Sequence, residues 1–163
     1  MNIRSTRLIQ ALALSCVAAG ALAASAHFVR GPTASIDTSS GNVTVTWKEA
    51  GLGDTVSVDY VAGATAAARY QCVNHGGKCP AAANKQDVLS NVSASGTFQS
   101  GKNGAINGSL TFEPPEGTLN CPGGQVLKMV SVSFTNISLS DTTDGITANA
   151  TPSALAMSGP ECP

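Results

Sequence analysis

The sequence predicts an all-β protein, folded as a single antiparallel β-sandwich of the immunoglobulin-like type with two disulfides. Three observations predict this class. Apolar side chains alternate with polar ones over several short segments. Gly, Asn, Asp and Pro recur in the connections between those segments. No segment carries a helical period with caps. About eight short strands, with a turn every ten residues or so, are typical of such a sandwich.

Each strand is expected where β-branched or aromatic residues occupy every second position. Val43, Val45 and Trp47 set the pattern, since they share one face of a strand while the residues between them are polar. A strand of this kind buries its apolar face and exposes the other, which places Trp47 in the core. Strands are expected at 33–37, 43–48, 56–60, 64–73, 88–98, 106–112 and 125–139.

Two of these segments need separate justification. Within 125–139 the apolar residues change parity between Phe134 and Ile137, which predicts a bulge near Asn136. The Ala-rich run inside 64–73 suits a helical turn by propensity alone, but the alternation that follows it favours a strand. The carboxyl tail, 152–163, is expected to be irregular and held in place by Cys162.

The amino terminus has the layout of a secretory signal peptide. A basic start at Arg4 and Arg7 is followed by an apolar run and then by Ala24-Ser25-Ala26, a cleavage site of small residues. We therefore expect a signal peptide at 1–26 and a secreted or periplasmic β-sandwich domain at 27–163, with no membrane span after cleavage. An uncleaved anchor and a lipoprotein modified at Cys16 are the alternatives.

Four cysteines remain after the predicted cleavage. An even number in a small exported domain indicates two disulfides, and four cysteines allow three connectivities. The preferred connectivity joins Cys72 to Cys121 across the fold and Cys79 to Cys162, which ties the tail to a loop. A zinc site is less well supported, because no C-x-x-C pair exists and six residues separate Cys72 from Cys79.

Composition and motifs narrow the function classes. The formal net charge is −1 and only 12% of the 163 residues are charged, which argues against a nucleic-acid binder built on a basic patch. The sequence contains no G-x-S-x-G, H-E-x-x-H, P-loop or dinucleotide-binding pattern. These observations favour a non-enzymatic interaction or structural module, without a cofactor, whose extracellular or cell-envelope ligand the sequence does not identify.

The alternative function is a copper-binding protein or copper redox enzyme. Cleavage after Ala26 would leave His27 as the free amino terminus, so that its α-amino group and imidazole could bind Cu(II) together with the imidazole of His75. Such a set of three nitrogens suits Cu(II). No other histidine is present to complete a larger set.

Several local strings resemble those of a family of small secreted proteins found in bacteria and fungi, for which no activity is assigned. The strings are KEAGLG at 48–53, the segment from Cys72 through Gly76-Gly77, and CPGGQ at 121–125. The resemblance implies secretion and a core disulfide between Cys72 and Cys121. It implies no catalytic residue.

The same strings suggest a binding surface. Loops at 48–54, 74–85 and 121–125 would form a recognition rim if they met at one end of the sandwich, where loops commonly carry binding residues. The alternative is that their glycines and cysteines only satisfy backbone geometry. The candidate rim residues are Lys48, Glu49, Asn74, Asn84, Lys85 and Gln125.

Overall fold

The computed structural model describes residues 25–81 and 83–163, so most of the predicted signal peptide lies outside the described residues. The described residues form two antiparallel sheets and contain no helix. Two disulfides join Cys72 to Cys121 and Cys79 to Cys162. The expected all-β class with two disulfides, in the preferred connectivity, is therefore confirmed.

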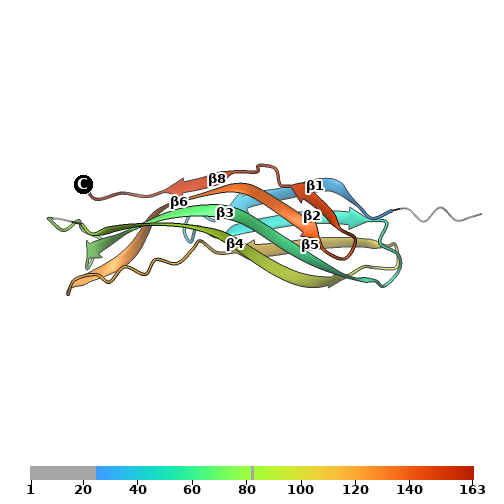
Figure 1. Cartoon of the computed structure of the whole chain (residues 1–163), viewed down its shortest axis with the longest axis horizontal. Helices are drawn as coiled ribbons and strands as arrows, with labels where there is room; N and C mark the ends of the chain where they lie inside the picture. Colours follow the sequence, from blue (N-terminus) through green and yellow to red (C-terminus); the bar gives the residue numbers. More distant parts are fainter. Residues whose placement is uncertain (1–24, 82) are drawn as a thin grey trace, which may run out of the picture.

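The two sheets differ in length (Figure 1). The three-stranded sheet has the order β1-β2-β5, and it covers only part of a longer sheet with the order β4-β3-β6, in which both β7 and β8 pair with β6. The strands are β1 (His27–Ile36), β2 (Val43–Ala50), β3 (Ser57–Asn74), β4 (Lys85–Gln99), β5 (Ala105–Phe112), β6 (Gln125–Asp141), β7 (Ile146–Asn149) and β8 (Leu155–Ser158).

Alternation in the strands determines which side chains form the core. Val43, Val45 and Trp47 of β2 are all buried, as their shared parity predicts. The Trp47 ring contacts the Tyr60 ring of β3 at 4.7 Å between centroids, so the two sheets pack face to face. Gly108 lies directly opposite Trp47 on β5, where a Cβ would overlap the indole.

β3 is one continuous strand of 18 residues, whereas the sequence predicted separate strands at 56–60 and 64–73. It lies between β4 and β6 and pairs with both of them along most of its length. Pairing on both sides overrides the helical propensity of its Ala-rich run and carries the strand through Gly63. β4 also extends beyond the predicted 88–98 at both ends, whereas β6 exceeds the predicted strand at 125–139 by only two residues.

The predicted bulge at Asn136 is confirmed. Asn136 has a positive φ of 55°, and Asn136 and Ile137 of β6 together oppose Ala64 of β3. The extra residue reverses the parity of the strand, so Ile137 faces the core as Phe134 does.

The carboxyl tail is only partly irregular. β8 forms at Leu155–Ser158 and pairs with 131–134 of β6, a stretch that β7 does not reach. The prediction of an irregular tail is therefore wrong for these four residues, because the unpaired edge of β6 offers them a ladder. The attachment of the tail through Cys162 is confirmed.

Candidate functional site

A buried polar cluster lies where β2 ends. Glu49 on β2 faces Tyr60 on β3, and the Tyr60 hydroxyl donates a 2.8 Å hydrogen bond to Glu49 Oε2. Asp141 at the end of β6 is the direct neighbour of Tyr60 in the ladder between β3 and β6. Its Oδ1 accepts hydrogen bonds from the backbone N–H groups of Thr143 (2.8 Å) and Asp144 (3.0 Å), which shapes the turn after the strand.

Burial dominates the electrostatics of this cluster. It raises the pKa of Glu49, against the lowering effect of the Tyr60 hydrogen bond, and the neighbouring Asp141 carboxyl raises it further. Burial and the Glu49 carboxyl also raise the pKa of Tyr60. The pKa of Asp144 is raised by burial and by the charge of Asp141. Glu49 therefore holds its proton more tightly than an exposed glutamate does.

The cluster is closed to solvent. Glu49 is 0% and Asp141 1% exposed, and Glu49 Oε1, Asp141 Oδ2 and Trp47 Nε1 have no hydrogen-bond partner. A substrate outside the protein cannot reach these carboxyl oxygens in this conformation. The cluster thus contains a glutamate with a raised pKa but lacks the solvent access that an active site needs.

The sequence placed Glu49 on an exposed rim, and the structure corrects this. β2 runs on to Ala50, so Glu49 continues the buried parity of Trp47. Asp141 was not singled out as a site residue, but it too continues a buried parity, that of Leu139. An acidic residue at the next position of an apolar alternation is the signal that would have identified both.

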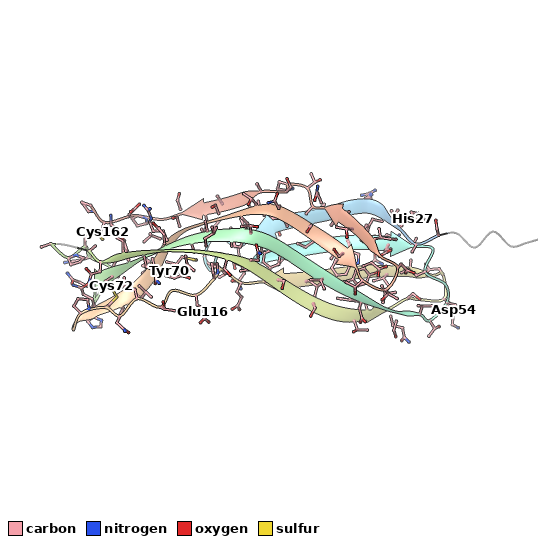
Figure 2. The ribbon with its side chains drawn as sticks, viewed as in Figure 1. His27, Asp54, Tyr70, Cys72, Glu116 and Cys162 are labelled. Carbon is pink, nitrogen blue, oxygen red and sulfur yellow. A yellow bond between two sulfur atoms is a disulfide. The ribbon has the colours of Figure 1, made fainter. Side chains whose placement is uncertain are left out.

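Two segments cover the opposite end of the long sheet, one on each face. On the inner face, Cys121 bonds to Cys72 and the Tyr70 hydroxyl donates to the Pro115 carbonyl at 2.6 Å. On the outer face, the N–H of Cys162 donates to Gln71 Oε1 at 2.9 Å. Figure 2 shows the segment that carries Glu116 on one side of β3 and the tail with Cys162 on the other.

Ion pairs fasten the tail on the outer face. Arg69 donates to both carboxylate oxygens of Asp87, at 2.6 and 3.0 Å, and contacts Glu161 at 3.2 Å. Lys85 also contacts Glu161 at 3.2 Å. The Arg69 guanidinium lowers the pKa of Asp87, and Lys85 contributes most to lowering that of Glu161. Because these side chains are exposed to solvent, each pair contributes little to the stability of the fold.

The six candidate rim residues do not form one surface. Asn74 pairs with Gln125 at the disulfide end, where the Asn84 carbonyl accepts a hydrogen bond from Cys72 N–H. Lys48 lies near the end of β2, a few residues before Asp54, which Figure 2 shows at the end of the molecule opposite Cys72. A strand of 18 residues spans roughly 55–60 Å, so the loop at 48–54 lies far from those at 74–85 and 121–125. The prediction of a single rim is wrong.

The two histidines, like the rim loops, lie far apart. His27 begins β1 and its ring hydrogen-bonds to the Ser25 carbonyl, whereas His75 is in the loop between β3 and β4. They occupy opposite ends of the molecule and cannot ligate one copper ion within one chain. Within the described ranges, no group of three or more His, Cys, Asp or Glu side chains is arranged to hold a metal ion.

The outer face of the long sheet carries a polar surface in its middle. Its hydroxyl and amide side chains bear no charge and come mostly from outward positions of β4 and β6, while β3 contributes Thr65 between Gly63 and Ala67. A shallow depression of about 400 Å³ lies over Ala67 and is bounded by Arg69, Asp87 and Leu89. The residues of the middle region are Thr65, Asn91, Ser93, Ser95, Ser133, Thr135, Ser138 and Ser140.

The chain matches no protein-family model and no curated protein. The resemblance to small secreted proteins therefore stays a prediction that rests on the quoted strings. In the part of the chain that the structure describes, no helix is long and apolar enough to cross a membrane.

Proposed function

We propose that this chain is an exported, non-enzymatic module that acts through binding or as a structural component, outside the cytoplasm or in the cell envelope. The observation that carries the proposal is the outer face of the long sheet. It is broad, its middle carries small uncharged polar side chains, and a disulfide and ion pairs fasten a covering tail at one end. A rigid polar surface of this kind suits contact with another macromolecule or matrix.

Two disulfides support export. Disulfides persist in oxidising compartments and are rare in the cytosol, where thiols are kept reduced. Disulfides most often complement a core with few aromatic residues in small exported domains, and the sequence predicts such a domain.

The burial of the acidic pair supports a non-enzymatic role. Glu49 has the raised pKa that acid–base chemistry uses and lies close to Asp141, but neither residue is accessible to solvent. The exposed Glu161 is engaged in ion pairs that fasten the tail, and Asp87 pairs with Arg69 between β4 and β3. These acidic groups therefore serve the fold.

An immunoglobulin-like topology is part of the proposal. In constant-type immunoglobulin domains the first, second and fifth strands are neighbours in one sheet, and the third, sixth and seventh are neighbours in the other. The orders β1-β2-β5 and β3-β6-β7 agree with this. The fourth strand differs, because β4 pairs with β3 at the edge of the longer sheet, and β8 has no counterpart.

Fractionation of the producing cell tests the export half of the proposal. We expect a mature chain that begins at His27, in the medium or envelope fraction, with all four cysteines oxidised. An uncleaved chain in the cytosol with free thiols would overturn the proposal.

Binding of the mature chain to envelope and matrix fractions tests the interaction half. We expect Thr135→Lys, in the middle of the outer face, to lower retention about tenfold, because a buried charge costs affinity. Thr111→Lys, on the exposed face of the other sheet, is the matched control and should keep wild-type retention. Equal loss in both variants, or turnover of any candidate substrate, would contradict a binding role for the outer face.

A further inference from the structure

The two sides of the sandwich are closed differently. On one side, backbone hydrogen bonds join β1 to the segment between β7 and β8: Ala34 N–H donates to Thr151 O at 3.2 Å, and Thr151 N–H donates to Pro32 O at 2.9 Å. On the other side lie the edge strands β4 and β5, and within the described residues no backbone hydrogen bond joins them. This second side therefore presents unpaired backbone groups.

β4 is the longest edge on that open side. All 15 of its residues pair with β3 without a register shift, so its free edge is regular from end to end. Its charged residues, Lys85 and Asp87, both lie at its beginning, and the stretch from Val88 to Gln99 contains neither a charge nor a proline. A long, regular, uncharged edge is the form that accepts a further strand.

The other edges carry features that discourage pairing. β1 contains Pro32 and two register shifts, which distort its ladder. β7 and β8 have only four residues each. β5, which shares the open side, is half as long as β4, with 8 residues. Among the described edge strands, β4 is therefore the long one that lacks these protective features.

The core is incompletely covered along the same edge. Val92, Ala94 and Phe98 of β4 pack against the core but are only partly buried, and Leu110 of β5 beside them is also half-buried. Their remaining exposure lies at the margin of the core where the sheet ends. A strand added to β4 would cover this apolar margin as well as the backbone groups.

We propose that β4 pairs with β4 of a second copy of this chain, antiparallel about a twofold axis at Ser93, so that two five-stranded sheets join into one. This axis places Val92 beside Ala94 and Val88 beside Phe98 of the other copy, with Ser93 opposite itself. These pairs keep the inner and outer faces of the joined sheets aligned, because residues of equal parity meet. The pairing deepens the proposed role as an interaction or structural module, and it rests on that role.

Charge and symmetry favour a second copy over a foreign strand. In the antiparallel arrangement Asp87 of one copy meets the uncharged Gln99 of the other, so within β4 no like charges face each other. The same patch meets itself, as in a closed twofold interface, and leaves no free β4 edge for further growth. The pairing should therefore stop at a dimer.

The oligomeric state of the mature chain tests the proposal. We expect sedimentation and light scattering to show a monomer–dimer equilibrium over concentrations that reach about 1 mM. Ser93→Lys and Ser93→Glu should each raise the dimer dissociation constant about tenfold or more, because equal charges then face each other across the axis. An equimolar mixture of the two variants should recover dimers, since opposite charges then meet.

Ala156→Lys is the matched control, because Ala156 is exposed on β8 at the other edge of the same sheet. It should dimerise like the wild type, and thermal unfolding should show that all variants fold. A protein that stays monomeric up to the highest concentration overturns the pairing, as does a dimer that Ser93→Lys does not weaken. A monomer that captures a synthetic uncharged β-strand peptide on β4 would assign the edge to a foreign strand instead.

The two proposals fail in distinguishable ways. If the chain is exported and binds envelope or matrix fractions as a monomer, the proposed function stands and the β4 pairing is wrong. If it dimerises through Ser93 but remains in the cytosol, the pairing survives and the export proposal fails.

Discussion

Glu49 and Asp141 are the residues whose chemistry depends most on their position in the fold. Each occupies an inward-facing position at the end of a strand in which buried apolar residues alternate with exposed ones. Each carboxyl group therefore points into the core. An isolated carboxylate in such surroundings is costly, so burial favours the protonated form of the Glu49 carboxyl group. The raised pKa of Glu49 is the consequence.

Replacing Glu49 by Gln should stabilise the protein at neutral pH. Because the folded state raises the pKa of Glu49 above its ordinary value of 4.5, the folded chain binds more protons than the unfolded chain just above that value. The stability that this proton contributes is present below about pH 4.5 and is lost as the pH rises through the folded-state pKa. Gln keeps an acceptor for the Tyr60 hydroxyl and does not ionise, so we expect a gain of about 1–3 kcal/mol at pH 7 and little change near pH 4.

Urea unfolding of both proteins between pH 4 and pH 8 measures this difference. Glu113→Gln, at an exposed position, is the control and should follow the wild-type curve at every pH. A constant difference between Glu49→Gln and wild type across the range would show that Glu49 does not titrate in the window.

Gly108 should tolerate no side chain. Its Cα faces the Trp47 indole so closely that an added Cβ would overlap the ring, and the indole in turn packs against Tyr60 and Phe98. We expect Gly108→Ala to lower the unfolding free energy by about 1–3 kcal/mol through overpacking. Gly123→Ala is the comparison, since an added Cβ there meets nothing within 4 Å. Equal denaturation midpoints for the two variants would contradict this packing.

At the level of the elements, the alternation of apolar and polar residues predicted the strand faces well, whereas the expected strand ends were less accurate. The faces of β2 and the bulge in β6 followed from parity, because burial selects every second side chain regardless of the partner strand. The continuity of β3 did not follow, because Gly63 looks like a strand end until strands on both sides pair with it. β8 was missed for a similar reason, since its ladder depends on an edge of β6 that local sequence does not show.

The bulge in β6 makes a prediction of its own. Asn136 has a left-handed backbone conformation, which Asn and Gly adopt readily and β-branched residues do not. We expect Asn136→Val to destabilise the fold by about 1–2 kcal/mol, whereas Asn136→Gly should leave it nearly unchanged. Thermal unfolding of the two variants distinguishes this backbone effect from a loss of the Asn side chain, which would destabilise both variants equally.

For the whole molecule, the continuity of β3 decides where the candidate sites lie. A reversal of the chain near Gly63 would have brought the loops before and after this segment to the same end, as a single rim requires. One continuous strand sends them to opposite ends. It also separates His27 from His75, which directly follows β3; Figure 2 shows His27 at the end of the molecule opposite Cys72. The single rim and the copper pair were therefore compatible with the local sequence. The continuous pairing of β3 with its neighbouring strands contradicts both.

The same length makes the disulfide end depend on its cross-links. There the three-stranded sheet no longer covers β3, and the segments tied by Cys72–Cys121 and Cys79–Cys162 cover its two faces instead. The bonds close long stretches of chain, with sequence separations of 49 and 83 residues, so the chain-entropy account gives each a stabilisation of about 4–5 kcal/mol.

Removing Cys79–Cys162 with two serine substitutions should free the tail before the sandwich opens. The tail then relies on exposed ion pairs and the hydrogen bond from Cys162 N–H to Gln71, which contribute little alone. We expect amide exchange to rise by orders of magnitude at Gly159 and Glu161 while β2 stays protected, with a global loss of about 4–5 kcal/mol in urea. Removal of Cys72–Cys121 should cost a similar amount but expose Tyr70 on the inner face. If exchange in the first variant rises equally in β2 and the tail, the end of the long sheet and the sandwich unfold as one cooperative unit, and the covering tail has no separate stability.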